Sequence, residues 1–468
     1  MQSTQESITL QTVSAQLQNW SPLVNAIVRA IDAAGGTVLA VGGAVRDCFL
    51  GKPITDLDCE VYNLSLEALE DILKQFGPIR TVGKAFGVLR VDGLDTDWSL
   101  PRTDAEGRRP RVALDKAMTY HAACRRRDLT INAIGINLKT GELVDPCDGL
   151  SDLHAGILRS PDITQFSADP LRLFRVMQFV SRFQMRVDDA LNAACSAMDV
   201  SGVSRERIEQ EWHKMMLRSE RPSLGIRWLN SINRLHDLFP ELYALINTPQ
   251  RADYHPEGDV FEHSMQALDA AVGQLQICTT ELEKRQLLYA TLCHDLGKPS
   301  TTVWDQNRWR SPGHAEAGVA VARSFLRRIT REKDLIRCVL TLVEHHMAPG
   351  DFVRNNASDG AYKKLAMKLS PVTSIRMIAS VSYADRAGRN DMSSLPLSEK
   401  CLIIAQFAER AQQLGIWEQP EPPVLSGDDL KDLCPPGPQI GVLLRRAYAY
   451  QIKHGVRNRD ALLKYLKV

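Results

Sequence analysis

The N-terminal part of the chain opens with polar residues and then shows one amphipathic helical pattern. Residues 21–36, "SPLVNAIVRAIDAAGG", repeat apolar positions with the period of a helix, start at Ser21 and Pro22, and stop at two glycines. The residues before this segment read as a polar tail. The pattern therefore predicts an N-terminal tail followed by one amphipathic helix.

Short β-branched runs follow and predict strands. The runs "TVLAV" (37–41) and "LDCEVY" (57–62) flank a helical segment, "AVRDCFLG" (44–51), which a glycine closes. The runs "FGVLRVDG" (86–93) and "DTDWSLPR" (95–102) continue the alternation. This mixture of strands and short helices predicts a small mixed α/β head that ends near residue 149.

From Leu150 onward the spacing of apolar residues is helical almost throughout, as in "ADPLRLFRVMQFVSRF" (168–183). A histidine-rich helical region begins near "YHPEGDVFEHS" (254–264), and the proline-rich "EQPEPPVLSG" (418–427) predicts a linker. The predicted fold class is α+β, with a small mixed α/β head followed by mostly α-helical parts. The expected segments are 1–35 (tail and helix), 36–149 (head), 150–250 (helical neck and body), 251–392 (histidine-rich domain) and 393–468 (helical C-terminal segment).

Length and charge narrow the classes of function. A chain of 468 residues suggests about two to four domains. A net charge of +1 gives no global basic surface, so contacts to nucleic acid would come from local clusters such as Arg108–Arg111 and Cys124–Asp128. The ten cysteines include no CxxC pair, which favours a reducing compartment. Because no leader pattern or long uncharged apolar run is present, we expect a cytoplasmic protein without a membrane segment.

Two carboxylates one residue apart supply the first candidate chemistry. In a strand, Asp56 and Asp58 point to the same face while Leu57 faces the core. Carboxylate oxygens suit Mg²⁺, which bridges to substrate phosphates in phosphoryl transfer. We therefore expect Asp56 and Asp58 to be catalytic Mg²⁺ ligands. Asp97, on a predicted neighbouring strand, is the candidate third carboxylate, with Asp95 as the alternative.

A glycine pair precedes these carboxylates. Gly42 and Gly43 lack a Cβ, so the backbone can approach triphosphate oxygens, and the following helix offers free N–H groups. Arg46, one turn into that helix, could pair with a phosphate. The order of glycine turn, arginine and paired carboxylates predicts a nucleotide site.

Four motifs together resemble the head and neck of class II tRNA nucleotidyltransferases and bacterial poly(A) polymerases, in the polymerase β superfamily. They are "GGAVRDCFLGKPITDLD" (42–58), "RRDLTINAI" (126–134), "LVDPCDGLSDL" (143–153) and "ADPLRLFRVMQF" (168–179). The resemblance runs from about Val38 to Phe183. It implies Mg²⁺-dependent transfer of nucleotides from CTP or ATP to an RNA 3′ end without a nucleic-acid template, with tRNA as the partner.

The resemblance also implies roles for further residues. Arg127 would contact the nucleotide, and Asp169 and Arg172, with Arg175 one turn on, would present hydrogen bonds to the base. A carboxylate and a guanidinium at i and i+3 on one helix face offer acceptors beside donors. The glutamate that the family has before Asp169 is Ala168 here, which leaves open whether CCA, CC or A is added.

The histidine-rich region carries a second constellation. His263, adjacent His294 and Asp295, and Asp385 occur in the order H, HD, D, with further histidines at 314, 345 and 346. Mixed imidazole and carboxylate ligation suits Ni²⁺, Mn²⁺, Co²⁺ or Fe more than structural zinc. For Lys298 the favoured role is a cation at a helix end, with neutralisation of a phosphate as the alternative.

This order resembles the HD phosphohydrolase superfamily over about Val260 to Arg389. The resemblance implies His263, His294, Asp295 and Asp385 as metal ligands of a phosphatase or 2′,3′-cyclic phosphodiesterase. The expected function is addition or repair of the tRNA 3′ CCA end with an HD hydrolase activity. The alternatives are a CC-only or A-only enzyme, a poly(A) polymerase, and an HD phosphohydrolase whose head only binds nucleotide. The sequence sets no oligomeric state.

Overall fold

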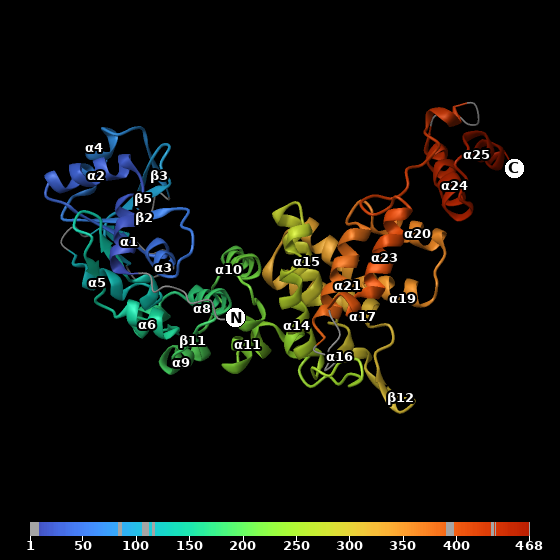
Figure 1. Cartoon of the computed structure of the whole chain (residues 1–468), viewed down its shortest axis with the longest axis horizontal. Helices are drawn as coiled ribbons and strands as arrows, with labels where there is room; N and C mark the ends of the chain where they lie inside the picture. The colour runs from blue at the N-terminus through green and yellow to red at the C-terminus, as the bar shows by residue number, and fades with distance from the viewer. Residues whose placement is uncertain are drawn as a thin grey trace. The chain divides into compact units, whose positions relative to one another are not determined.

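A computed structural model gives the fold of the chain (Figure 1). It describes residues 9–82, 87–104, 112–114, 118–389, 397–431, 435 and 437–467. The basic cluster Arg108–Arg111 lies outside the described residues. The chain divides into two compact units, Met1–Val203 and Ser204–Val468, which are described separately.

The first unit is built on a seven-stranded sheet with the order β3-β4-β5-β2-β1-β8-β9. Its strands are β1 (Thr37–Val41), β2 (Leu57–Tyr62), β3 (Ile79–Val82), β4 (Val88–Val91), β5 (Thr96–Ser99), β8 (Gly135–Asn137) and β9 (Leu143–Val144). The pair β2 and β5 is parallel, and the other neighbours are antiparallel. The predicted strands at 37–41 and 57–62 are confirmed at the centre of this sheet, where both faces carry buried residues.

Helices and short strand pairs complete the first unit. The helices are α1 (Leu10–Gln18), α2 (Pro22–Ala33), α3 (Gly43–Phe49), α4 (Leu66–Lys74), α5 (Tyr120–Arg125), the 3-10 turn η1 (Thr130–Asn132), α6 (Gly149–Ala155), α7 (Ile163–Ser167), α8 (Leu171–Phe183) and α9 (Asp189–Ala197). The paired strands are β6 (Arg102–Asp104) with β7 (Val112–Leu114), and β10 (Ile157–Leu158) with β11 (Arg186–Val187). The predicted α2 is confirmed, with Ser21 as its N-cap.

The expected polar tail contains a helix, α1, and this part of the prediction needs correction. Val13 and Leu17 are fully buried, and α1 packs against α3. The Ser14 hydroxyl donates to the Gly141 carbonyl over 2.6 Å. Apolar residues one helical turn apart were present in the sequence, but the surrounding glutamines and threonines concealed them.

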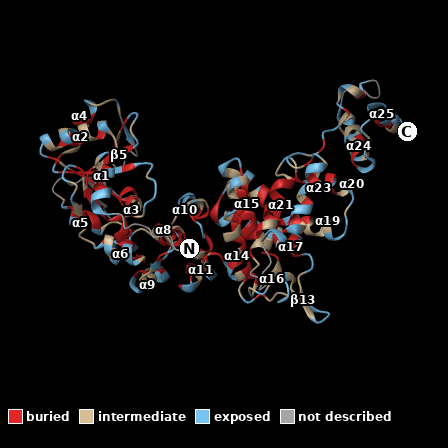
Figure 2. Ribbon diagram, viewed as in Figure 1, coloured by how far each residue is buried: buried red, intermediate tan, exposed pale blue. Residues whose placement is uncertain are grey.

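Among its described residues, the regular structure of the second unit is helical apart from one hairpin, and α14, α15 and α21 carry many of the buried residues (Figure 2). Its first elements are α10 (Arg205–Arg218), α11 (Ser223–Ser231), α12 (Leu235–Leu238), α13 (Pro240–Tyr243), α14 (Val260–Val272), η2 (Leu275–Ile277), α15 (Glu281–Cys293), α16 (Lys298–Thr301), β12 (Val303–Asp305) and β13 (Arg308–Arg310). The rest are α17 (His314–Ile329), α18 (Lys333–His345), α19 (Ala348–Arg354), α20 (Asp359–Leu369), α21 (Ile375–Ala387), α22 (Leu397–Lys400), α23 (Leu402–Gln413), η3 (Asp428–Leu430), α24 (Pro438–His454) and α25 (Arg459–Leu466). The α+β fold class is confirmed.

The proline-rich segment at 418–427 is anchored to the helices around it. Glu421 is buried and pairs with Lys363 over 2.6 Å and with Arg457 over 2.9 Å. Burial opposes its ionisation, but hydrogen bonds from these cations lower the pKa of Glu421 to about 2. Across the described part of the chain, no helix combines the length and apolar character needed to cross a bilayer.

Candidate functional site

The two predicted carboxylates lie where β2 begins. Leu57 between them is fully buried, whereas Asp56 and Asp58 reach solvent on the other face. Val41 pairs with Asp58 between β1 and β2, so the glycine turn after β1 lies beside the Asp58 carboxylate. Asp58 and Asp97 are register partners in the parallel pair β2 and β5. The sheet thus brings both sequence motifs and the third carboxylate together.

Of the two candidates for that third carboxylate, Asp97 is the one in register with Asp58. Asp95 precedes β5, is exposed, and uses its backbone oxygen to accept a 3.0 Å hydrogen bond from Leu57 N–H. The Asp97 carboxylate is half-buried and pairs with Arg90 Nε over 2.6 Å. This geometry favours Asp97.

The crowding of carboxylates shows in the ionisation of Asp58. Burial of its carboxylate and the negative charges of Asp56 and Asp97 raise the pKa of Asp58 to about 6, although part of the side chain reaches solvent. The positive charge of Arg127 opposes this shift. A divalent cation would remove this mutual repulsion. Because the donors are all carboxylate oxygens, the residues present fit Mg²⁺.

Gly42 keeps the space beside the carboxylate open. Its φ is +74°, and a Cβ on it would lie 3.3 Å from Asp58 Oδ2. A Cβ on Gly43, which begins α3, would lie 3.5 Å from Arg46 Nη2. Arg46 is buried and donates to Asn132 Oδ1. Its expected phosphate contact stays a prediction, because the guanidinium is engaged with the protein here.

Glu60 is a residue of the site that sequence reasoning missed. It lies on β2 two positions after Asp58, is 2% exposed, and accepts hydrogen bonds from Tyr62 Oη (2.7 Å) and Arg127 Nη2 (3.3 Å). Burial opposes its ionisation, but Arg127 and Tyr62 hold the pKa of Glu60 below its ordinary value. Glu60 thereby holds Arg127 near Gly42, whose Cβ position would be 3.7 Å from Arg127 Nη1. The sequence did contain a signal for Glu60, because it is a third acidic residue at the next alternate position of the strand after Asp56 and Asp58.

Helix α8 is tied to the head by an ion pair. Arg175 Nε donates to Asp128 Oδ2 over 2.7 Å, and Asn132 Nδ2 donates to Asp128 Oδ1 over 2.9 Å. Burial opposes the ionisation of Asp128, but Arg175 and Asn132 lower its pKa to about 2. Arg175, expected near the base, is therefore engaged in fixing α8 to the "RRDLTINAI" segment.

Asp169 and Arg172 do not share a helix, which corrects the expectation of a common helix face. Pro170 is the N-cap of α8, so Asp169 lies before the helix and its Oδ1 accepts from Leu171 N–H over 3.2 Å. Arg172 N–H donates to the Asp169 carbonyl over 3.0 Å, which keeps the two residues within one turn. Arg172 Nη2 also donates to the Arg126 carbonyl over 2.6 Å. The neck motif is thus held against the arginine-rich segment of the head.

The predicted metal ligands of the second unit converge from three helices. His263 lies on α14, His294 and Asp295 follow α15, and Asp385 lies on α21. His263 Nε2 is 3.0 Å from Asp385 Oδ1 and 3.3 Å from His294 Nε2. His294 Nε2 is 3.1 Å from Asp295 Oδ2. His263, His294 and Asp295 are buried, so the helices have brought polar atoms together inside the core.

Two further histidines complete the cluster. His314 starts α17 and His346 follows α18, and their Nε2 atoms are 3.2 Å apart. His314 Nε2 is 3.4 Å from Asp295 Oδ1, the oxygen that does not face His294. Asp295, His314 and His346 therefore form a second group of close ligand atoms that shares Asp295 with the first. His345 belongs to neither of these groups.

The hydrogen bonds of the rings show which nitrogen is available for a metal. The Nδ1 atoms of His294, His314 and His346 lie 2.7–2.8 Å from the carbonyls of Thr291, Ser311 and Val343. Because a carbonyl only accepts, each Nδ1 carries the proton and each Nε2 points into the cluster. Burial and nearby histidines lower the pKa of His346 to about 3, which leaves it neutral. Neutral imidazoles fixed through Nδ1 are typical metal ligands.

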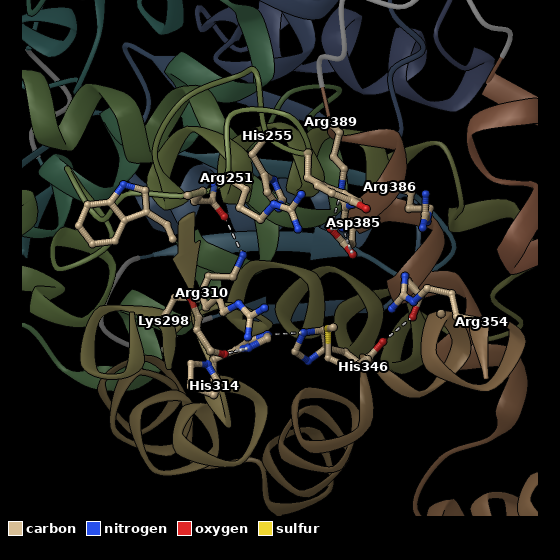
Figure 3. Close-up of a pocket in the computed structure, with 18 of the residues that line it drawn as sticks. Arg251, His255, Lys298, Arg310, His314, His346, Arg354, Asp385, Arg386 and Arg389 are labelled. Atoms are coloured by element: carbon tan, nitrogen blue, oxygen red, sulfur yellow. Dashed lines mark hydrogen bonds and ion pairs between the residues drawn. The ribbon is translucent and has the colours of Figure 1, made fainter. Parts of the chain in front are cut away.

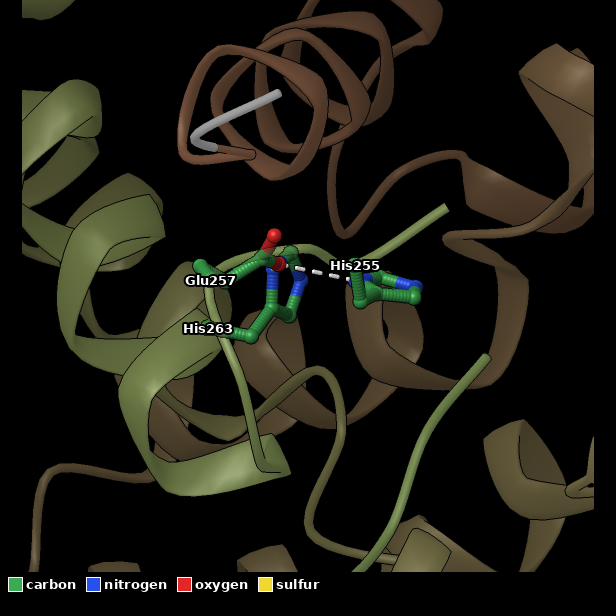
Figure 4. Close-up of side chains that lie close together, drawn as sticks. All are labelled: His255, Glu257 and His263. Carbon is green, nitrogen blue, oxygen red and sulfur yellow. Dashed lines mark hydrogen bonds and ion pairs between the residues drawn. The ribbon is translucent and has the colours of Figure 1, made fainter. Parts of the chain in front are cut away.

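Glu257 is a second residue that sequence reasoning missed. Its Oε1 accepts from His263 Nδ1 (2.7 Å) and His255 Nδ1 (2.9 Å), and it lies between the two rings (Figure 4). Burial opposes its ionisation, but these histidines lower the pKa of Glu257 to about 2. A carboxylate behind a ligand histidine orients the ring. The only sequence signal for this role was that Glu257 lies where the composition changes, just before α14.

A cavity of about 470 Å³ opens onto the cluster and contains His314, His346 and Asp385 in its wall. Figure 3 shows Lys298 and Arg310 on one side of this cavity and Arg354 and Arg386 on the other. Lys298 was predicted either to neutralise a phosphate or to be a cation at a helix end. Its Nζ pairs with Asp295 Oδ2 over 2.7 Å, so it contacts one of the predicted metal ligands. Cations around a metal cluster can hold an anionic substrate.

Comparisons with known proteins match two domain families in this chain. The family model for the poly A polymerase head domain matches residues 38–159, and the model for the HD domain matches residues 260–379. A multifunctional CCA protein of Methylobacillus flagellatus is 35% identical over 66% of this chain and 73% of its own length. One from Chromobacterium violaceum is 31% identical over 80% of this chain and 90% of its own length.

Solved structures show the same fold at low sequence identity. A Bacillus stearothermophilus CCA-adding enzyme in complex with CTP is 18% identical and covers 96% of this chain and 98% of its own, with a TM-score of 0.65. A Thermotoga maritima CCA-adding enzyme complexed with tRNA is 19% identical over 97% of both chains, with a TM-score of 0.58. These matches show the fold, and the two sequence relatives show that the chain belongs to the family of the multifunctional CCA proteins.

Proposed function

We propose that the head adds the nucleotides C, C and A to the 3′ end of tRNA from CTP and ATP. The observation that carries this proposal is the joint placement of Asp58, Asp97 and the Gly42 turn at the same end of neighbouring strands in one sheet. The names of the sequence relatives support tRNA end formation over poly(A) synthesis. The residues of the head that we propose to act are those that sequence reasoning selected, with Glu60 in addition.

In this proposal Asp56, Asp58 and Asp97 hold Mg²⁺, which activates the RNA 3′ hydroxyl and neutralises charge on the leaving pyrophosphate when bound. The Gly42 turn leaves room for the triphosphate, and Arg127, held by Glu60, contributes positive charge. Asp169 and Arg172 would offer an acceptor and donors to the edge of C or A.

Three tRNA substrates test this function. The full chain is incubated with Mg²⁺, CTP and ATP and with tRNAs that end before CCA, after C, and after CC, and the products are sequenced. We expect all three to end in CCA. Addition restricted to C or to A would contradict CCA addition and indicate a split-function enzyme. Long A tails would indicate a polymerase, and no addition would reduce the head to a binding module.

We also propose a metal-dependent phosphohydrolase in the second unit, because buried imidazole Nε2 atoms and carboxylate oxygens from separate helices converge on one another. His263, His294, Asp295 and Asp385 would hold one ion, and Asp295, His314 and His346 a second. Mixed imidazole and carboxylate ligands suit Ni²⁺, Mn²⁺ or Co²⁺, and such an ion supplies an activated water for attack on a phosphoester. The cavity cations would hold the phosphoester next to the cluster.

The adjacent histidines 345 and 346 offer a matched pair of variants. His346→Ala is expected to lower the metal bound after dialysis by about one ion per chain, and phosphatase activity by at least about a hundredfold, because Nε2 of this ring faces the cluster. His345→Ala is expected to keep both. Metal content by mass spectrometry and p-nitrophenyl phosphate hydrolysis give the two readouts. Unchanged metal content in His346→Ala would exclude the proposed second metal ion.

A further inference from the structure

A short hairpin forms one wall of the cavity of the second unit. Its strands β12 and β13 pair Trp304 with Trp309 across the hairpin, and the two rings meet edge to face at 5.1 Å. Gln306 and Asn307 both have positive φ, which is typical of a tight two-residue turn. A two-stranded hairpin of this length is barely stable without a cross-strand pair, and the tryptophans supply that pair.

The pairing explains Trp309 but leaves the outer face of Trp304 open. Trp304 is 57% exposed and Val303 is 49% exposed. Trp309, in contrast, is half-buried and lines the cavity. A large aromatic side chain kept in solvent beside a candidate active site favours a binding surface.

The hairpin is continuous with the metal cluster. Arg310 at the end of β13 lines the same cavity as His314, His346 and Asp385. Arg310 Nη1 pairs with Asp305 over 3.3 Å, which fixes its side chain along the hairpin. A ligand that touches the metal cluster and extends past Arg310 therefore reaches the two tryptophans.

Cationic side chains make up most of the charged lining of the cavity, and five of the six pair with a neighbouring carboxylate. Asp385 is the one carboxylate among the described lining residues. Six cationic side chains also line the cavity: Arg251, Lys298, Arg310, Arg354, Arg386 and Arg389. Asp385 is paired with Arg389 over 2.9 Å. Cations gathered around one cavity favour an anion with several charges.

We propose that the hairpin at 303–310 and the cavity form one path for the end of a single-stranded RNA. The terminal phosphoester would lie at the metal cluster, cavity arginines would contact the next phosphates, and Trp304 would stack on an unpaired base. This inference rests on the proposed phosphohydrolase function and adds its substrate class, a polynucleotide end in preference to a mononucleotide. Aromatic platforms beside a cationic groove are typical of proteins that bind single strands.

A strand of RNA fits the two observations better than a protein segment does. Base stacking uses the face of a single exposed aromatic ring, and phosphates complement the cations around the cavity. A helical or extended peptide would need a longer apolar groove, whereas the apolar residues of the hairpin are limited to Val303, Trp304 and Trp309, with polar residues from Asp305 to Arg308 between them. The RNA is therefore the occupant we test.

The test compares two substrates of the same site in the full chain. Wild type, Trp304→Ala, Trp304→Phe and the control Tyr243→Ala are assayed on p-nitrophenyl phosphate and on a 12-nucleotide RNA with a terminal 2′,3′-cyclic phosphate. Tyr243 is 47% exposed and lies on α13, outside the cavity wall. We expect Trp304→Ala to raise KM for the RNA about tenfold and to leave KM for p-nitrophenyl phosphate unchanged. Trp304→Phe should restore most of the loss, and Tyr243→Ala should match wild type.

The outcomes separate the two proposals. If Trp304→Ala leaves KM for the RNA unchanged while wild type hydrolyses its substrates, the proposed RNA path is wrong and the phosphohydrolase proposal stands. Trp304 would then be a candidate contact for a protein partner. If wild type cleaves neither substrate, the phosphohydrolase proposal fails. In that case 4-thiouridine near the 3′ end of the same RNA is crosslinked to the chain. Crosslinks at 303–310 would support the path, and crosslinks confined to other segments would overturn it.

Discussion

Asp58→Ala is expected to lower the rate of nucleotide addition to tRNA by at least about a thousandfold, while hydrolysis of p-nitrophenyl phosphate stays within about twofold of wild type. The loss corresponds to several kcal/mol of transition-state stabilisation that the metal ligand makes available. Asp56→Ala is expected to behave in the same way. The two activities are measured on one preparation of the full chain, so a folding defect would be seen in the second.

The neighbouring carboxylates of β5 provide a sharper control. Asp97 is in register with Asp58, whereas Asp95 precedes the strand and contributes only its backbone oxygen. Asp97→Asn is therefore expected to lose at least about a hundredfold in nucleotide addition, and Asp95→Asn to stay within about twofold. If Asp95→Asn were the damaging variant, the third carboxylate would have to be reassigned. If Asp58→Ala kept its activity, the metal site of the head would be wrong.

Asp295→Asn is expected to abolish hydrolysis in the second unit, with a loss of at least about a thousandfold, and to leave CCA addition within about twofold. One oxygen of Asp295 lies 3.1 Å from His294 Nε2 and the other 3.4 Å from His314 Nε2, so this carboxylate serves both ligand groups. An amide keeps the shape but brings an N–H donor and no negative charge. Bound metal, measured by mass spectrometry after dialysis, should fall together with activity.

Asp334→Asn is a matched control for this variant. Its carboxylate lies in the first turn of α18 and is 76% exposed, so the change should alter neither bound metal nor hydrolysis. The melting temperature of Asp295→Asn is measured beside wild type to follow the fold. A variant that lost its metal and still hydrolysed phosphoesters would show that the cluster is structural and that the chemistry lies elsewhere.

The α/β head could be predicted from the sequence because its signals are local. Alternation around Leu57 places Asp56 and Asp58 on one face whatever the rest of the chain does. The Gly42 and Gly43 turn is recognisable from residue type, because residues other than glycine rarely adopt a positive φ such as that of Gly42. The helices that carry His263, His294 and Asp385 follow from the helical period, and the family of the chain was recognisable from the order of its motifs.

Tertiary structure alone decided what these side chains contact. Asp97 could be chosen over Asp95 only when the register of β2 and β5 was known. Arg46 and Arg175 carry the charge expected of nucleotide contacts, yet the fold pairs them with Asn132 and Asp128. These partners lie 86 and 47 residues away, beyond the reach of any local pattern.

The same distinction applies to the cluster of the second unit. Its sequence contains seven candidate ligands spread over 263–385, and nothing in the sequence distinguishes His345 from His346. Only packing of α14, α15, α17, α18 and α21 points His346 inward and brings Glu257 behind His263. The sequence by itself therefore determined the elements and the kind of chemistry each can support, because periodicity and residue type are local. The tertiary structure decided which side chains meet, because their partners come from helices and strands far apart along the chain.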